Sequence, residues 1–529
     1  MTERMLLNGN EAVATAALDA GVGLGTGYPG TPSTEILEHF SEIGGRAQWA
    51  PNEKVALEVG LGACFGGADV LVTMKHVGVN VAADPLFTAA YTGVTGGLVL
   101  ISADDPGMAS SQNEQDNRHY ARAAGVPMLE PADSQEAYDM TRLGLELSRR
   151  FGMIFILRMT TRICHSKTIV QRSEPTEPAT IPYQKDIPTR VMIPAYARGA
   201  HKKLRDKLAR LAEWNEAEGP NPIHPGSGEL GIITSGISYV HAREAAPEAG
   251  ICKLGLTWPL PIETIRSFAA DYDRVVVIEE GDPVVVESLR AEGIDVEGKD
   301  AMYRFGELSV DRVTRILAGD TSPEPAPPKG KPPQLCPGCP HRNVFEILRD
   351  EGCIVAGDIG CYTLGVLPPF EAMDTCVCMG ASIGVGLGLR HVLPEEQAAK
   401  VVSVIGDSTF AHSGLTGLAE MVYNPPETGH VVIILDNNTT AMTGLQEHPG
   451  TGRKLDHTPA NQVVFEDVAR AMGIKNVTVM NPSSETEKFA EEVRAALKRR
   501  ELSLIIGRRP CLLAAGKIKQ YQAAAEGCE

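Results

Sequence analysis

The sequence predicts a multi-domain α/β protein built on parallel sheets, and three observations support this fold class. The 529 residues are enough for about three or four domains of ~150 residues each. Apolar, strand-like runs alternate with helical segments over most of the chain. Several of these runs end in loops rich in Gly, Pro, Asp and Ser. In open parallel sheets, ligands bind at the carboxyl ends of the strands, so these loops are where we expect a site.

The first part of the chain alternates helices and strands. We expect helices at 11–22 and 136–152, and strands at 70–76, 96–105 and 153–159. These elements form a first domain that we place at 1–180.

Prolines and charges interrupt the pattern from about 167 to 228, around one expected helix at 201–217. We assign 181–225 to a connecting segment. Strand-like runs at 229–236 and 274–282 then indicate a smaller α/β domain over 226–319.

A run of six prolines in GDTSPEPAPPKGKPPQ marks the clearest boundary, and we place a stiff, extended linker at 320–334. The remaining residues, 335–529, contain four buried, parallel-type strands, each with a helix nearby. They lie at 353–360, 400–410, 430–438 and 502–509.

Composition excludes several classes of function. The formal charge of −18 argues against nucleic-acid binding, which needs a surplus of Lys and Arg on one face. No apolar run reaches the ~18 residues of a membrane span, and the N-terminus lacks a signal-peptide layout, so we expect a cytoplasmic protein. Eleven unevenly spaced cysteines favour metal binding or reactive thiols over a disulfide framework.

Two strand ends in the last domain carry side chains suited to a metal. One strand ends at Gly406, Asp407 and Ser408, and the next ends at Asn437 and Asn438. A strand–helix–strand layout brings Asp407 and Asn437 to the same edge of the sheet. Their oxygens suit an octahedral Mg²⁺ that completes its shell with water and phosphate, and Gly406 lets the backbone approach a diphosphate. The alternative is that Asp407 and Asn437 only cap helices and turns.

This arrangement resembles the thiamine diphosphate motif, which starts with GDG and ends with NN. The start here is GDS, which departs from the motif at Ser408. Carried over by position, the motif makes Asp407, Asn437 and the carbonyl of Thr439 the ligands of Mg²⁺. Asn438 replaces Asn437 if the register slips by one residue.

Further stretches identify a family. YPGTPSTEI, NEKVALEVGLGA, CMGASIGVGLGL, QLCPGCPHRNVF and GDIGCYTLG together resemble the 2-oxoacid:ferredoxin oxidoreductases, specifically the large subunits of the indolepyruvate type. KLGLTWPLP and IEEGDPVVVE match as well, so the resemblance runs from near the N-terminus to about residue 512. It implies two thiamine-diphosphate-binding-type domains, one for the pyrimidine and one for the diphosphate. A smaller domain like the C-terminal domain of transketolase lies between them.

The resemblance also suggests residues around the cofactor. Glu53 opens a helix after a strand-like run and is the candidate for the carboxylate that hydrogen-bonds the aminopyrimidine; an ordinary helix-start glutamate is the alternative. Met379, Gly380 and Ile383 belong to the stretch that faces the pyrimidine, where an apolar wedge is needed. Packing of small residues between helices is the alternative for that stretch.

Substrate-binding residues are less well defined by the sequence. Thr31 matches a family position close to the substrate, but it is also placed to cap the helix STEILEHF. His76 and Asn80 are pocket candidates, although a single histidine is more often structural. No arginine for the substrate carboxylate can be matched, and Arg118, Arg158 and Arg162 all remain open. The subfamily implies an aryl 2-oxoacid such as indolepyruvate or phenylpyruvate.

Four cysteines match the family's ligands for a [4Fe–4S] cluster beside the cofactor: Cys336, Cys339, Cys361 and Cys511. Four thiolates are the number that such a cluster requires, and a Cys₄ zinc site is the competitor on spacing alone. Cys376 and Cys378 form only a CxC pair. The family's large subunit continues into a ferredoxin-like tail, whereas this chain shows only Cys528 there. We therefore expect electrons to leave through a partner subunit or directly to a soluble acceptor.

Three functions are consistent with these observations. The first is oxidative decarboxylation of a 2-oxoacid to its acyl-coenzyme A, with electrons passed to ferredoxin and a smaller, beta-type subunit as partner, in a dimer of heterodimers. The second is a non-oxidative thiamine diphosphate-dependent decarboxylase, against which the four retained cysteines argue. The third is a non-catalytic subunit, against which Asp407, Asn437 and Glu53 argue.

Overall fold

The computed structural model describes residues 3–177, 182–325, 330 and 332–526. It divides into two compact units, residues 1–325 and 326–529, called the first and second units below. Cys528, expected at the start of a tail, lies outside the described residues. No helix among the described residues is long and apolar enough to cross a membrane.

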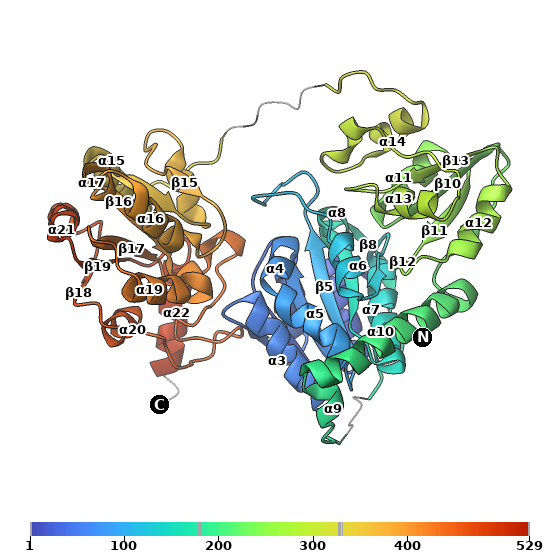
Figure 1. The fold of residues 1–529 in the computed structure, drawn as a ribbon, viewed down its shortest axis with the longest axis horizontal. Helices are drawn as coiled ribbons and strands as arrows, with labels where there is room; N and C mark the ends of the chain where they lie inside the picture. The colour runs from blue at the N-terminus through green and yellow to red at the C-terminus, as the bar shows by residue number, and fades with distance from the viewer. Residues whose placement is uncertain (1–2, 178–181, 326–329, 331, 527–529) are drawn as a thin grey trace. The chain divides into compact units, whose positions relative to one another are not determined.

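A seven-stranded sheet forms the core of the first unit (Figure 1). Its strands, in spatial order, are β12 (Leu256–Trp258), β6 (Met128–Leu129), β7 (Phe155–Thr160), β5 (Leu98–Asp104), β4 (Val70–Lys75), β2 (Leu24–Gly27) and β3 (Ala47–Trp49). All neighbours pair in parallel except β12, which runs antiparallel to β6. The strands predicted at 70–76, 96–105 and 153–159 are confirmed.

Helices cover both faces of this sheet, as two successive residues of β2 show, since their side chains point to opposite sides. A Cβ at Gly25 would meet Leu37, whereas Thr26 lies against Gly60. Leu37 belongs to α2 (Thr34–Glu42) and Gly60 to α3 (Glu53–Phe65). Further helices extend the two layers: α1 (Gly9–Asp19) and α7 (Ser134–Phe151) pack together, and α5 (Ala83–Thr92) packs against α3 and α10 (Pro194–Glu218).

The first unit also contains a four-stranded sheet. Its strands, in spatial order, are β13 (Arg274–Ile278), β10 (Leu230–Ser235), β11 (Gly250–Leu254) and β9 (Ile223–His224). One strand from the same stretch of sequence, β12, joins the seven-stranded sheet instead and ties the two sheets together. The domain boundaries expected from the sequence remain predictions.

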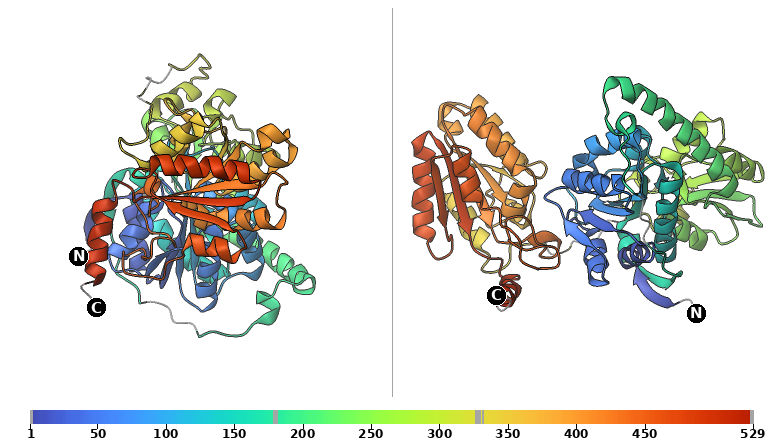
Figure 2. Two further views of the ribbon diagram at one scale, coloured as in Figure 1. Left: turned by 90° about the vertical axis from the view of Figure 1, so that its left-hand side faces the viewer. Right: turned by 90° about the horizontal axis from the view of Figure 1, so that it is seen from below.

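A six-stranded sheet, parallel throughout, forms the second unit (Figure 2). In spatial order its strands are β15 (Thr375–Cys376), β14 (Ile354–Gly357), β16 (Val401–Gly406), β17 (His430–Asp436), β19 (Leu502–Arg508) and β18 (Asn476–Met480). Two separate apolar cores show that both faces are covered. One core takes residues from α15 (Pro340–Asp350) and α21 (Thr486–Arg499); the other takes them from α16 (Ala381–Val392), α19 (Leu415–Tyr423) and α20 (Phe465–Ala471).

Two local details differ from the expected pattern. The helix expected at 201–217 is the C-terminal part of the 25-residue α10. After β16, the chain does not form a loop before its helix. Asp407 opens the short helix α18 (Asp407–Thr409), a π-helical turn follows at Phe410–Gly414, and α19 continues from it. The π-turn packs against β16, and Asp407 directly follows Gly406, the last residue of that strand.

Candidate functional site

The ends of β16 and β17 are neighbours, as the strand pattern predicts, and they form the first part of the candidate site. Asp407 is 2% exposed, and its Oδ1 accepts the amide of Ser408 at 2.9 Å. Its Oδ2 accepts the amide of Asn438 at 2.7 Å, so the carboxylate links the two strand ends directly. Asn437 is 8% exposed, and its Oδ1 accepts the amide of Thr439 at 3.1 Å.

Two buried carboxylates lie side by side at this edge. Asp436 lies beside Asp407; burial first, and then the negative charge of Asp407, raises the pKa of Asp436 to about 6. Burial also acts to raise the pKa of Asp407, but the charge and hydrogen bond of His448 outweigh it and hold that pKa below its ordinary value. His448 Nε2 lies 3.2 Å from Asp407 Oδ2. Arg508 Nε donates to Asp436 Oδ2 at 2.6 Å, so both carboxylates have a cationic partner within the protein. Carboxylate oxygens are donors of the kind that Mg²⁺ prefers.

Asn438 offers a further oxygen at the same edge. Its backbone has φ of 60°, the left-handed conformation that asparagine tolerates better than most residues. Its Oδ1 is buried and has no hydrogen-bond partner among the described residues. An orphaned buried oxygen beside a carboxylate pair is consistent with a ligand at this edge.

Two of the glycines predicted to contact the cofactor are required by protein packing. A Cβ at Gly406 would lie 2.6 Å from Cε1 of Tyr362. A Cβ at Gly380 would lie 2.3 Å from that of Ser413, and Gly380 has φ of 85°. Packing alone therefore explains why neither position carries a side chain, whatever its role toward a diphosphate.

The expected pyrimidine-facing stretch, 379–383, begins α16. Asp358 fixes its start, because its two oxygens accept the amides of Gly380 at 2.8 Å and Ser382 at 3.0 Å. Ile383 is fully buried in the core beneath this helix, whereas Met379 is only half-buried. Between these two residues, Met379 is therefore the one with surface left for a ligand. No pattern in the sequence pointed to Asp358 as the residue that fixes the start of this helix.

The four predicted cluster cysteines come from three segments of the second unit, because Cys336 and Cys339 share one loop, and these segments meet at the same sheet edge. A Cβ at Gly338, between Cys336 and Cys339, would lie 3.4 Å from Leu512, the neighbour of Cys511. Burial first, and then the neighbouring thiols of Cys511, Cys339 and Cys336, raises the pKa of Cys361 to about 11. Cys511 donates its amide to the carbonyl of Asn437 at 2.8 Å, which joins the cysteine loops to the candidate magnesium edge.

Within the described residues, no three His, Cys, Asp or Glu side chains stand ready to hold a single metal ion. In a Cys₄ zinc site four thiolates surround one ion. In a [4Fe–4S] cubane each thiolate binds a different iron, so the sulfurs lie farther apart than in a mononuclear site. The ten described cysteines are all free thiols.

His341, the last residue of CPGCPH, connects the two parts of this edge. It is 3% exposed, and its Nε2 lies 3.4 Å from Nδ2 of Asn437. Its ring is nearly perpendicular to that of Tyr362, with centroids 6.2 Å apart. Burial lowers the pKa of His341 to about 4, so the ring is neutral at pH 7. Sequence reasoning missed His341, although its place directly after the cysteine pair was a usable signal.

In the first unit, Glu53 is the first residue of α3, as the sequence predicts, and it is 5% exposed. Asn52 caps the helix by accepting the amide of Val55 at 2.9 Å. A Cβ at Gly78 would lie 2.6 Å from Oε1 of Glu53, so this glycine makes room for the carboxylate. The carboxylate thus stands at a strand–helix corner, next to the helix that His76 begins.

His76 is fully buried, and its Nε2 lies 3.1 Å from the carbonyl of Asn113. Its Nδ1 has no hydrogen-bond partner among the described residues. Asn80, the other pocket candidate, exchanges hydrogen bonds with Gln115 at 2.9 and 3.1 Å. Asn80 and Gln115 are therefore joined to each other, while His76 keeps one ring nitrogen without a partner.

Thr31 is half-buried and precedes Pro32 across a cis peptide bond. The N-cap of α2 is Ser33, so the alternative that Thr31 caps this helix is wrong. Lys75 lies beside the same loop: a Cβ at Gly30 would be 3.0 Å from the Cβ of Lys75. Burial lowers the pKa of Lys75, whose Nζ donates to the carbonyl of Ser110 at 2.5 Å. Sequence reasoning did not single out Lys75.

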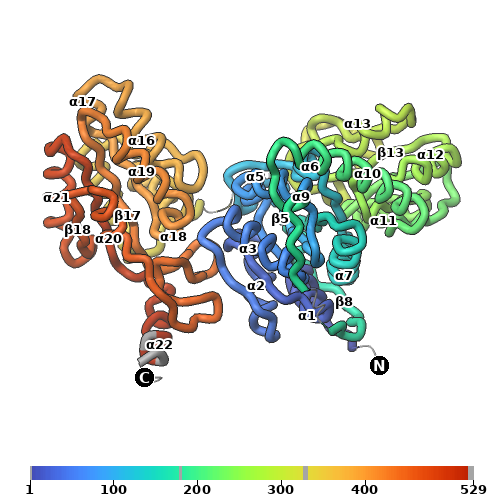
Figure 3. Tube along the Cα trace, turned by 60° about the horizontal axis from the view of Figure 1, so that its bottom comes forward, coloured from blue at the N-terminus to red at the C-terminus, as the bar shows by residue number. Residues whose placement is uncertain are grey.

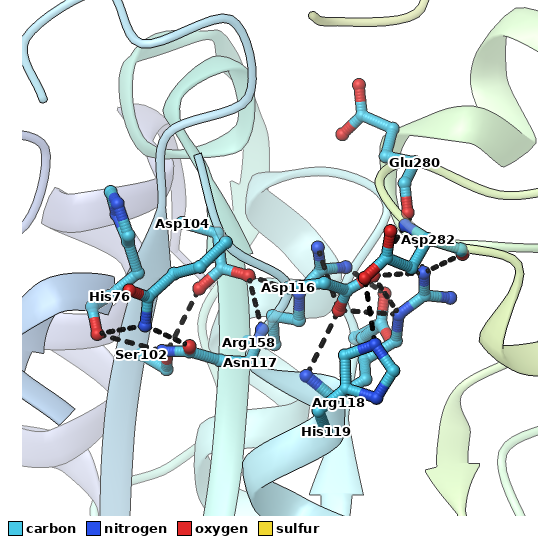
Figure 4. Close-up of polar contacts among 12 residues, drawn as sticks. His76, Ser102, Asp104, Asp116, Asn117, Arg118, His119, Arg158, Glu280 and Asp282 are labelled. Carbon is cyan, nitrogen blue, oxygen red and sulfur yellow. Dashed lines mark hydrogen bonds and ion pairs between the residues drawn. The ribbon is translucent and has the colours of Figure 1, made fainter. Parts of the chain in front are cut away.

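The three arginines left open for a substrate carboxylate are all paired within the protein, and Figure 4 shows Arg118 and Arg158 among their partners. Arg118 binds Asp116 and Glu279, each at 2.5 Å. Arg158 binds Asp104 at 2.6 Å and Glu130 at 3.0 Å. Arg162 makes two hydrogen bonds to Glu307, at 2.6 and 2.7 Å. These arginines therefore have structural partners. Arg118 also connects the part of the first unit built on the seven-stranded sheet to the four-stranded sheet, because Glu279 follows β13 directly.

The same buried network reaches His76. Asn117 donates to the carbonyl of His76 at 3.1 Å and to Ser102 at 2.8 Å, and Ser102 donates to Asp104 at 3.0 Å (Figure 4). Asp104 in turn binds Arg158. A continuous chain of hydrogen bonds therefore connects the backbone of His76 to the buried ion pair of Asp104 with Arg158, and this chain fixes the position of His76.

Comparisons with known proteins identify the domains that carry these residues. The family model described as "Thiamine pyrophosphate enzyme, C-terminal TPP binding domain" matches residues 358–506. The model described as "Pyruvate flavodoxin/ferredoxin oxidoreductase, thiamine diP-bdg" matches residues 15–197. Together with the paired strand ends, these matches define a thiamine diphosphate-dependent 2-oxoacid oxidoreductase.

Curated relatives narrow the assignment. Indolepyruvate oxidoreductase subunit IorA of Archaeoglobus fulgidus is 40% identical over 97% of this chain and 87% of the relative. The subunit of the same name from Methanothermobacter thermautotrophicus is 38% identical over 99% of this chain and 90% of the relative. The chain therefore belongs to the family of indolepyruvate oxidoreductase IorA subunits.

A solved structure shares the fold at lower identity. It is a 2-oxoglutarate:ferredoxin oxidoreductase from Magnetococcus marinus, with 2-oxoglutarate, coenzyme A and succinyl-CoA bound. The match has a TM-score of 0.53 at 18% identity and covers 60% of this chain and 65% of that one. At this identity the likeness supports the fold, an α/β architecture with parallel sheets.

Proposed function

We propose that this chain, with a smaller partner subunit, oxidatively decarboxylates an aryl 2-oxoacid of the indolepyruvate or phenylpyruvate type to its acyl-coenzyme A. Electrons pass through one [4Fe–4S] cluster to ferredoxin or a partner subunit. The single observation that carries the electron-transfer part is the hydrogen bond from the Cys511 amide to the Asn437 carbonyl. It puts a loop with a candidate cluster thiolate against the candidate edge for the cofactor.

Each candidate residue has a role that follows from its position. Asp407, Asn437 and the Thr439 carbonyl would hold Mg²⁺, and with it the diphosphate of the cofactor. Glu53 would hydrogen-bond the aminopyrimidine through a carboxylate that is buried and fixed at a helix start. When bound, thiamine diphosphate supplies the carbanion that attacks a 2-oxoacid and the electron sink for loss of CO₂.

Other residues prepare the site. Asp358 orients the start of α16 through two amides, which presents Met379 at the surface of the fold. His341 is neutral and contacts both Asn437 and Tyr362. It therefore supports a candidate magnesium ligand without adding charge to the site. Thr31 and His76 would contact the substrate. Because the three candidate arginines are paired within the protein, Lys75, which lies beside the loop of Thr31, is the cation that would bind the substrate carboxylate.

One preparation tests the proposal. The complex with its partner is purified without oxygen, and iron, sulfide and thiamine diphosphate are measured. Reduction of a viologen dye by arylpyruvates is then followed with and without coenzyme A. We expect about four irons per chain and dye reduction that depends on coenzyme A. A preparation with thiamine diphosphate but without iron contradicts the electron-transfer part.

Matched cysteine variants sharpen this test. Cys361→Ser is expected to lose most of the iron, because one of four ligands is removed. Cys353→Ser is the control, since this half-buried thiol of the same unit lies outside the set of four. If both variants keep full iron, the four-cysteine assignment is wrong. If aldehyde is the only product and no dye is reduced, the non-oxidative decarboxylase is the correct function.

A further inference from the structure

A separate cavity of about 230 Å³ lies within the first unit, between α5, α9 (Ile187–Arg190) and α10. These three helices pack side by side (Figure 3). The polar groups on its walls come from Tyr91, Thr92, Thr189, Tyr196, Lys203 and Lys207. None of these residues belongs to the candidate site described above.

The sequence of α10 creates this space. Ala195 and Gly199 lie four residues apart on one face of α10, and together with Ala200 they line the cavity, where larger side chains would fill it. A Cβ at Gly199 would have no atom within 4 Å, so the helix surface is open there. The opposite wall is the C-terminal end of α5, which Tyr91 and Thr92 provide.

Positive charge is concentrated at this cavity, although the whole chain carries a formal charge of −18. Lys203 and Lys207 line it, and Arg190 lies next to it and donates to the carbonyl of Thr92 at 2.6 Å. Burial first, and then the charges of Arg190, Arg210 and Lys203, lowers the pKa of Lys207. Mutual repulsion of this kind is relieved when an anion binds.

The acidic groups do not neutralise these cations. Within the described residues, no carboxylate lies within ion-pair distance of Lys203 or Lys207. Asp186 interacts with Arg190 and Lys203 over a longer range, but it is fully exposed and caps α9 by accepting the amide of Thr189 at 3.3 Å. Lys207 Nζ donates to the carbonyl of Gly152 at 2.7 Å, which leaves further N–H groups for a ligand.

Aromatic rings accompany the cations. The Tyr91 ring lies 5.3 Å from that of His201, with an angle of 30° between their planes. Tyr196 is half-buried on the facing helix, and Leu204 is 4% exposed beneath it. The walls therefore offer ring faces and aliphatic surface next to two ammonium groups, a combination that suits a planar, negatively charged organic molecule.

We propose that this cavity binds an organic anion with a single ring, whose carboxylate or phosphate group contacts Lys203 and Lys207 and whose ring lies against Tyr91 and Tyr196. Its size supports a single ring, because a cavity of about 150 Å³ accommodates benzene. The remaining space, about 80 Å³ by subtraction from 230 Å³, takes a small anionic group but not a dinucleotide.

Binding to the purified complex tests this proposal by isothermal titration with phenylacetate, phenyl phosphate and inorganic phosphate. We expect one of the two ring compounds to bind at least about tenfold more tightly than inorganic phosphate, and the better of the two identifies the anionic group. Lys203→Ala is expected to weaken that binding by about tenfold or more, the loss of one charged hydrogen bond. Lys202→Ala, at the exposed neighbouring lysine that does not line the cavity, is expected to leave binding unchanged.

Chemical labelling locates the bound molecule independently of activity. Acylation of lysines, read by mass spectrometry, is expected to slow at Lys203 when the ring compound is present and to stay constant at Lys202. Equal binding of inorganic phosphate shows a plain anion site and overturns the proposal. Absence of binding, or binding that Lys203→Ala does not change, overturns it as well, because the ring compound then binds elsewhere or not at all.

Discussion

Replacing Glu280 by glutamine is expected to remove a large part of the pH dependence of the stability of the first unit. Glu280 is 4% exposed, and its Oε1 accepts the amide of Leu308 at 3.0 Å. Its Oε2 has no hydrogen-bond partner among the described residues. Glutamine has the same shape and keeps an acceptor for Leu308, but it cannot ionise.

The magnitude follows from the pKa of Glu280, which burial chiefly raises from its ordinary value of 4.5 to about 7. Because the folded pKa is the higher one, this group stabilises the fold fully below pH 4.5, and the contribution disappears as the pH rises through about 7. One unit of pKa change corresponds to about 1.4 kcal/mol, so the change from 4.5 to about 7 corresponds to about 3 kcal/mol of the free energy of unfolding.

Urea unfolding followed by tryptophan fluorescence measures this effect. All three tryptophans of the chain, Trp49, Trp214 and Trp258, lie in the first unit, so the signal reports on that unit alone. The difference in free energy of unfolding between wild type and Glu280→Gln is measured from pH 5 to pH 7. Lys299 has a pKa lowered by burial to about 8, so its own titration lies largely above this range.

We expect the wild type to lose stability relative to Glu280→Gln across this range, by about 2 to 3 kcal/mol. A difference that stays constant within about 0.5 kcal/mol refutes the reasoning, because Glu280 would then be ionised throughout. A difference of the opposite sign would mean that the nearby cations Arg158 and Lys299 outweigh the cost of burial.

Three further outcomes follow from single contacts. Asp407→Asn is expected to weaken binding of thiamine diphosphate at fixed Mg²⁺ by about tenfold or more, measured by fluorescence titration, because even outer contacts of a metal site are worth that much. Gly406→Ala is expected to cost about 1–3 kcal/mol in unfolding of the second unit, followed by circular dichroism, because its Cβ would meet Tyr362 at 2.6 Å. Arg158→Met is expected to cost about 3–5 kcal/mol in the first unit, followed by tryptophan fluorescence, because it leaves buried carboxylates without a partner.

Each of these variants has a matched control. Asp467→Asn removes an exposed carboxylate of the same unit as Asp407 and should leave cofactor affinity unchanged. Tyr362→Leu, combined with Gly406→Ala, should cost less than the sum of the two single changes if the clash is real. Arg162→Met breaks a partly exposed pair and should cost no more than about 1 kcal/mol. Equal losses for Arg158→Met and Arg162→Met would contradict the buried network.

Local patterns in the sequence were enough to predict the layers of both units. Strand–helix alternation and apolar strands depend on residues a few positions apart, so the parallel sheets and the neighbouring ends at Asp407 and Asn437 could be derived without coordinates. The same holds for Glu53 at its helix start. The family resemblance added the candidate cysteines, whose loops the structure brings to one edge.

The partners of the charged groups could not be derived in this way. Arg118 binds Glu279, which is 161 positions away, and His448 reaches Asp407 across 41 positions. Strand β12 crosses into the seven-stranded sheet, although its neighbours in sequence build another one. Such contacts depend on how whole elements pack, because a charged side chain pairs with whatever the fold brings within a few ångströms of it. The sequence therefore determined the parallel-sheet frame of each unit and the strand ends that carry Asp407 and Asn437, and only the tertiary structure decided which charged groups pair with each other.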